Sequence, residues 1–162
     1  MAWFKTPDRA RELVSKLRAV TRGRLSVKLR AGYEDDDETL VSFSKGLVEE
    51  GVDALTLHGR LVKQKFKGRA NWEKVSMLAQ ALPSIPVAGN GDINSAQELL
   101  HRSSGTPGGV MVGRAAVRSP WIFDQAAARL APGSQIDLEE TVCLFIALLA
   151  RYQPVEFHPT RL

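Results

Sequence analysis

The sequence has 162 residues, enough for one domain or for one domain and part of another. Hydrophobic residues make up 44% and charged residues 25%, a globular composition that excludes a disordered or fibrous chain. The net charge of +4 is compatible with a polyanionic partner. A single cysteine, Cys143, excludes an internal disulfide and suits a reducing compartment, and the apolar runs are too short to cross a bilayer. We therefore expect a cytoplasmic protein with no membrane partner.

Helix and strand patterns alternate along the chain. Helices are predicted over 7–21, from the acidic run 34–38 to Gly51, over 72–82, after Asn94, and from Ser119 to about Leu130. Strands are predicted over 25–29, 52–57, 85–88 and 109–112. We interpret the acidic run as a solvated helix start rather than a metal site. We interpret Asn94 and Gln97 as the capping pair of the fourth helix.

Four strands, each followed by a helix, predict an α/β fold with parallel strands and right-handed crossovers. A complete (β/α)8 TIM barrel takes about 250 residues, so four βα units indicate a partial TIM barrel, a half barrel. An open doubly wound sheet fits the strand count as well, but no Gly-x-Gly-x-x-Gly follows the first strand. Beyond a linker at 131–134, a last apolar helix is predicted from Asp137, in which Cys143 is expected to pack.

Polar residues stand at the carboxyl end of every predicted strand. They are Lys28 and Arg30, His58 and Arg60, Asn90 and Asp92, and Gly113 and Arg114. Because the carboxyl ends of parallel strands meet at one mouth, we expect these residues to converge. Taken singly, Lys28 fits an edge lysine and His58 a core histidine, and their shared position favours a common site.

Two of these strand ends carry glycines that suit an anion. The sequence Gly89-Asn90-Gly91-Asp92 offers backbone N–H groups without obstruction by Cβ atoms, and Gly113-Arg114 sets a backbone amide beside a guanidinium. The loops after the last two strands of a barrel are a common phosphate site. The pair of motifs therefore predicts that a phosphate group binds here.

The segment after the second strand is rich in basic residues. Lys63, Lys65, Lys67 and Arg69 alternate along it, at the spacing of a loop that follows a phosphate backbone. Such a segment is either a solvated basic loop or a contact surface for RNA. Both interpretations stay open on the sequence.

The strand-end motifs together resemble one family, the tRNA-dihydrouridine synthases. The matching segments are Val27–Arg30, Leu57–Arg60, Val87–Ile93, Val110–Ala116 and Ser119–Phe123, and the resemblance covers about residues 8–125. Members of this family are oxidoreductases with a flavin-binding TIM barrel and a smaller helical RNA-binding domain. They reduce uridine in tRNA to 5,6-dihydrouridine with electrons from NADPH, which pass through FMN. The resemblance thus implies FMN as cofactor, NADPH as electron donor and tRNA as partner.

The resemblance also implies roles for individual residues. Lys28 and His58 would contact the flavin, and Asn90, Gly91, Asp92, Gly113 and Arg114 would hold its ribityl phosphate. Arg30 would lie near the target base, and Arg60 with Lys63, Lys65 and Lys67 would face the RNA. The implied domains are the C-terminal half of the barrel, 1–131, and a linker with the first helix of the RNA-binding domain, 132–162.

One family feature is not found in the sequence. The loop with the cysteine that protonates the uracil ring has no counterpart, and the surroundings of Cys143 do not resemble it. We therefore expect the chain to be a fragment that is inactive alone and that associates with a second chain or with itself. Two alternatives remain: a non-catalytic RNA-binding or regulatory product, and another FMN- or phosphate-binding barrel oxidoreductase.

Overall fold

The computed structural model describes residues 2–65, 67–128, 142–143, 146–147 and 151 of the chain. The chain divides into two compact units, Met1–Arg129 and Leu130–Leu162. In the second unit the described residues are helical, within the segment predicted as the last apolar helix. The linker and Asp137 lie outside the described residues. Cys143 is exposed, whereas the sequence predicted a packed side chain.

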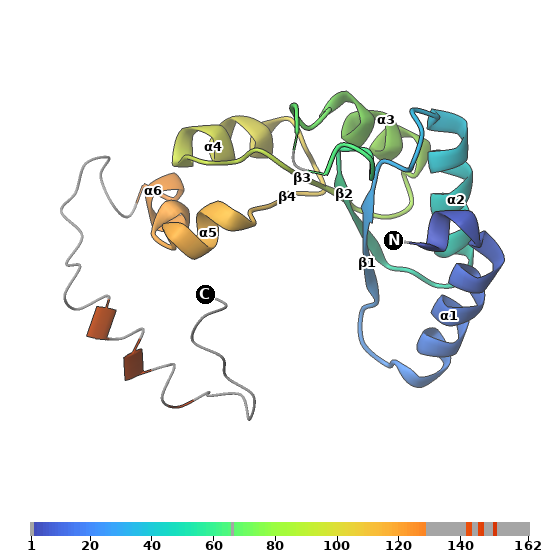
Figure 1. Cartoon of the computed structure of the whole chain (residues 1–162). Coiled ribbons are helices and arrows are strands. Elements are labelled where there is room, and N and C mark those ends of the chain that lie inside the picture. The colour runs from blue at the N-terminus through green and yellow to red at the C-terminus, as the bar shows by residue number, and fades with distance from the viewer. Residues whose placement is uncertain (1, 66, 129–141, 144–145, 148–150, 152–162) are drawn as a thin grey trace. The chain divides into compact units, whose positions relative to one another are not determined.

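The first unit is an α/β structure whose elements follow one another in regular order (Figure 1). They are the 3₁₀ turn η1 (Ala2–Lys5), α1 (Pro7–Val20), β1 (Ser26–Arg30), α2 (Asp37–Glu49), β2 (Ala54–His58), α3 (Glu73–Ala81), β3 (Val87–Asn90), α4 (Ala96–Ser104), β4 (Val110–Met111), α5 (Arg114–Arg118) and α6 (Ile122–Ala126). The four strands are parallel and neighbour one another in the order β1-β2-β3-β4. The α/β fold with parallel βα units is confirmed, in the arrangement of a partial barrel.

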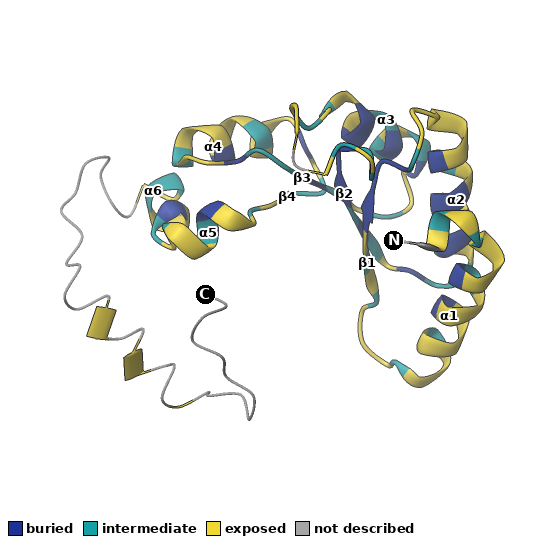
Figure 2. Ribbon diagram, viewed as in Figure 1, coloured by how far each residue is buried: buried dark blue, intermediate teal, exposed yellow. Residues whose placement is uncertain are grey.

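The main core lies between the sheet and the helices α1, α2 and α3 (Figure 2). Side chains alternate along a strand, so every second residue points into this core. In β2 these residues are Leu55 and Leu57, which are 1% and 0% exposed. A second, smaller cluster joins Leu99 of α4, Ala115 of α5 and Ile122 of α6.

We expect Leu57→Ala to lower the free energy of unfolding by about 2 to 5 kcal/mol, because it removes fully buried methyl groups and leaves a cavity. Urea unfolding followed by circular dichroism measures the change. Leu100→Ala is the control, since Leu100 is 53% exposed on α4 and its truncation leaves no cavity. Equal stability of the two variants would contradict this assignment of the core.

The acidic run begins α2, as the sequence predicted. Asp36 caps the helix, since its carboxylate accepts the Thr39 N–H at 3.0 Å. Asp35 and Asp37 both pair with Lys74, a buried lysine of α3. Within the described residues, no group of three or more histidine, cysteine or acidic side chains is placed to hold a metal ion.

The capping pair predicted for α4 is wrong by one residue. The helix is capped by Ser95, whose Oγ accepts the Glu98 N–H at 3.1 Å. The Glu98 carboxylate in turn accepts the Asn94 N–H at 2.7 Å. Both residue pairs have the required spacing, and Ser95 has the extended conformation that a cap needs.

The helix predicted from Ser119 to about Leu130 corresponds to α6, which is shorter than predicted. The sequence missed α5, a short helix between β4 and Ser119 that begins at Arg114 and ends at Arg118. Proline keeps the residue before it out of the helical region, and Ser119 has φ −145° and ψ 72°. The chain therefore restarts as α6 after Pro120.

No helix among the described residues has both the length and the apolar character of a membrane span.

Candidate functional site

One row of side chains crosses all four strands at their carboxyl ends. The parallel register pairs Arg30 with His58, His58 with Asn90, and Asn90 with Met111. A second row pairs Lys28 with Thr56. Their neighbours Leu29 and Leu57 point into the core, so the two rows occupy the opposite face of the sheet. The register alone thus assembles a polar surface.

A cavity of about 320 Å³ lies over this surface, a volume suited to a small ligand. Its walls are Lys28, Arg30, His58, Asn90, Gly91, Asp92, Ile93, Asn94, Met111, Gly113, Arg114 and Ala115. We call it the strand-end pocket. All seven residues predicted to bind a cofactor line it, together with Arg30. The sequence missed Ile93, Asn94, Met111 and Ala115, although the position of Met111 opposite Asn90 in the register identifies it once β4 is aligned.

His58 is buried, with 8% of its surface exposed. Burial lowers the pKa of its imidazole to about 4, assisted by the positive charges of Arg30, Lys28 and Arg60 against the opposing charge of Asp92. The ring is therefore neutral at pH 7. The pKa of Lys28 is lowered as well, first by desolvation and then by Arg30, although the residue is largely exposed.

Asn90 and Asp92 already use polar atoms within the protein. The Asn90 amide donates to the Met111 carbonyl at 2.7 Å and so ties β3 to β4. The Asp92 carboxylate accepts from Arg60 at 2.8 Å and from the Ala70 N–H at 2.7 Å. Burial raises the pKa of Asp92, but these two donors outweigh it, and the net pKa is lowered. The side chain of Asp92, as an ionised carboxylate, cannot donate a hydrogen bond to a phosphate. Its contacts instead hold Arg60 and the backbone at Ala70 in position.

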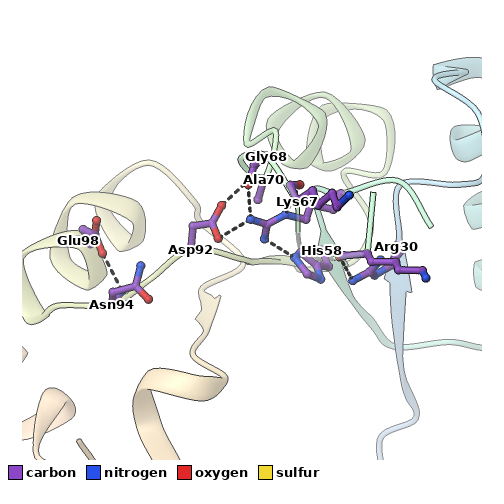
Figure 3. Close-up of polar contacts among 10 residues, drawn as sticks. Arg30, His58, Lys67, Gly68, Ala70, Asp92, Asn94 and Glu98 are labelled. Carbon is purple, nitrogen blue, oxygen red and sulfur yellow. Dashed lines mark hydrogen bonds and ion pairs between the residues drawn. The ribbon is translucent and has the colours of Figure 1, made fainter. Parts of the chain in front are cut away.

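Arg60 lies beneath the surface rather than on it. It is 3% exposed, and its guanidinium donates to the Gly68 carbonyl at 2.6 Å and to the Lys67 carbonyl at 3.4 Å. Figure 3 labels these two acceptor residues together with His58 and Asp92. The sequence grouped Arg60 with the RNA-facing residues, and this burial assigns it to holding the loop above it. The position of Arg60 after β2 could not reveal this burial. It depends on how the following loop folds back over the arginine.

Two arginines hold the basic loop, residues 61–70, through the carbonyls of its described residues, 61–65 and 67–70. Arg30 donates to the Leu61 carbonyl at 3.2 Å and to the Lys65 carbonyl at 2.6 Å, while Arg60 takes the carbonyls further along. The carbonyls of Leu61, Lys65, Lys67 and Gly68 therefore face inward. The side chains of Lys63, Lys65 and Lys67 are exposed and do not line the strand-end pocket. Lys63 pairs with Glu34 at the surface.

The chemistry of the strand-end pocket fits a phosphorylated ligand. Lys28, Arg30 and Arg114 bring positive charge to its walls, and the one carboxylate there, Asp92, is paired with Arg60. Gly113 borders open space, since an added Cβ there would meet no atom within 4 Å. Cationic side chains beside open backbone amides are the groups that bind phosphate.

Comparison with known proteins points to one family. The family description Dihydrouridine synthase matches residues 1–153. A probable tRNA-dihydrouridine synthase of Mycobacterium tuberculosis is 37% identical over 105 residues, which are 64% of this chain and 27% of that protein. The tRNA-dihydrouridine synthase B of Pseudomonas syringae is 30% identical over 136 residues, or 83% of this chain and 40% of that protein. The chain thus spans about a quarter to two fifths of the length of the curated relatives it matches.

Proposed function

Because the chain belongs to the dihydrouridine synthase family, we propose that its strand-end pocket binds FMN. We further propose that the chain is part of an enzyme that reduces uridine in tRNA to 5,6-dihydrouridine with NADPH. The observation that carries the proposal is the convergence of seven separate strand-end residues on one cavity. The position and charge of these residues support a cofactor that has a phosphate at one end.

The residues divide into two groups by chemistry. Arg114, with the backbone of Gly113 and Gly91 and the amide of Asn90, would hold the ribityl phosphate. Lys28 and His58 would contact the flavin ring, one as a cation and the other as a neutral imidazole. FMN, when bound, would supply the hydride for the uracil ring. Asp92 would act at one remove, by fixing Arg60 and the loop backbone.

The exposed lysines of the basic loop support an RNA partner. A uracil in folded RNA must leave its stack to meet a flavin, so the surface around the pocket has to bind the neighbouring backbone. The inward carbonyls leave Lys63, Lys65 and Lys67 directed to solvent, where they would bind phosphates. Arg30 lines the pocket below the loop, and we place the target base near it.

We propose that residues 1–162 bind FMN and tRNA but do not catalyse the reduction of uridine by themselves. No cysteine lines the strand-end pocket, and the described residues that do line it include no evident acid for the uracil carbon. A segment that bears the family's cysteine would then be needed to complete the site. The exposed basic loop also favours the second candidate function, a non-catalytic RNA-binding or regulatory product.

Flavin absorbance tests the cofactor site. We expect the purified chain to retain FMN after excess cofactor is removed. Lys28→Ala and Arg114→Ala should each weaken binding by about 10- to 100-fold, the cost of losing one charge-assisted hydrogen bond. Arg118→Ala is the matched control, since Arg118 lies on the same short helix as Arg114 and does not line the pocket.

The outcomes separate the candidates. Equal FMN binding by the wild-type chain and both pocket variants would remove the site assignment. A chain that binds tRNA tightly and binds no FMN would favour the non-catalytic RNA-binding product. A chain that binds FMN and shows no affinity for tRNA would favour another FMN-binding barrel oxidoreductase.

A further inference from the structure

The buried guanidinium of Arg60 contacts the pocket on one side and the basic loop on the other. Its Nη1 lies 3.3 Å from Nε2 of His58. Its Nη2 donates to Asp92 at 2.8 Å and to the Gly68 carbonyl at 2.6 Å. These contacts tie together the ends of β2 and β3 and a loop, so the direction of the N–H group that faces His58 is fixed.

This contact determines where the imidazole carries its proton. A guanidinium has hydrogen-bond donors and no acceptor, so Nε2 of His58 must accept. A neutral imidazole whose Nε2 accepts is protonated on Nδ1. We propose that Arg60 is a positioning residue that sets the tautomer of His58 and leaves Nδ1–H as the only donor of that ring in the pocket. The assignment follows from the chemistry of the partner and not from an observed hydrogen.

The charges around His58 help to keep its imidazole neutral at pH 7, so the ring has one proton and two possible tautomers. Lys28 and Arg30 act on the ring from β1, Arg60 from the chain just after β2, and Asp92 from the end of β3. Burial and the three cations oppose protonation, and Asp92 alone among these groups favours it. Removing Arg60 takes away one cation and leaves Asp92 without its ion-pair partner. Both changes raise the pKa of His58, by about one unit in sum.

A purely structural role for Arg60 makes a different prediction. If the pair of Arg60 and Asp92 only held the loop in place, removal of either partner would disturb His58 in the same way. In our proposal Asp92→Asn leaves the donor on Nε2 in place and removes the one anion near the ring. The tautomer is then unchanged and the pKa of His58 does not rise.

The test is nitrogen NMR of the imidazole rings in the ligand-free 162-residue chain. The His58→Asn variant identifies the His58 signals among the three histidines. We expect a wild-type ring with Nδ1 protonated and Nε2 bare at pH 7. Arg60→Met should give a mixture of tautomers and a pKa about one unit higher. Asp92→Asn should keep the wild-type tautomer, as should Arg69→Met, an exposed arginine of the same loop.

Several results would overturn the proposal: a wild-type ring protonated on Nε2, no change in Arg60→Met, or the same change in Arg60→Met and Asp92→Asn. If Arg60→Met does not fold, the wild-type and Asp92→Asn spectra decide, since Nε2 protonation in either is incompatible with a guanidinium donor. The significance of His58 as a ligand contact rests on the proposed function. The measurement needs neither FMN nor tRNA, so its failure is distinct from a failure of the flavin site.

Discussion

Replacing Lys63, Lys65 and Lys67 together by alanine is expected to weaken tRNA binding by about 100-fold at low salt. Each lysine that neutralises a phosphate releases one counterion, and its loss lowers the slope of log affinity against log salt by about one. Lys63 already pairs with Glu34, so we expect the slope to fall by about two to three. Filter binding or fluorescence anisotropy at several salt concentrations measures both quantities.

The substitutions should leave the path of the basic loop unchanged. The loop is held through its carbonyls by Arg30 and Arg60, and the three lysine side chains make no part of that contact. A control triple variant, Lys5→Ala, Lys16→Ala and Lys45→Ala, removes the same charge from exposed positions on η1, α1 and α2. If both triple variants lose affinity equally, the loss reflects net charge and the loop is not the RNA-binding surface.

The sequence predicted the strands and the convergence of their ends because both follow from local patterns. Alternation identified β1, and the repeated strand–helix order required parallel strands. Parallel strands bring their carboxyl ends to one side, so Lys28, His58 and Asn90 could be grouped before their positions were known.

The supporting contacts could not be predicted in that way. Arg60 and Asp92 are 32 residues apart, and their pairing depends on where the basic loop returns over the strand ends. No local pattern distinguishes a buried arginine from one that faces RNA. The cap of α4 was misplaced for a smaller reason, because Asn94 and Ser95 are both good caps, whereas Ser119-Pro120 marked the start of α6 in the sequence.

Gly91→Ala is expected to lower the free energy of unfolding by about 2 to 4 kcal/mol and to abolish most FMN binding. Gly91 has φ +121°, a conformation that residues with a Cβ atom rarely adopt. An added Cβ would lie 2.6 Å from Cβ of Ala70 and 2.9 Å from Cδ2 of His58. Either the imidazole or the basic loop must shift, and the imidazole is part of the pocket wall.

Two other glycines separate the effect on folding from the effect on the ligand. An added Cβ at Gly113 meets nothing within 4 Å, so Gly113→Ala should unfold at the wild-type urea concentration and lose FMN affinity only if phosphate occupies the space there. Gly23 also has open space, and it precedes the amino end of β1, whereas the pocket lies at the carboxyl end. Gly23→Ala should therefore change neither quantity. Urea unfolding and flavin titration measure the three variants side by side. A Gly91→Ala chain as stable as Gly23→Ala would contradict the close approach at His58. A Gly113→Ala chain with wild-type FMN affinity would mean that the phosphate does not lie beside Gly113, and the argument from Gly91 would still hold.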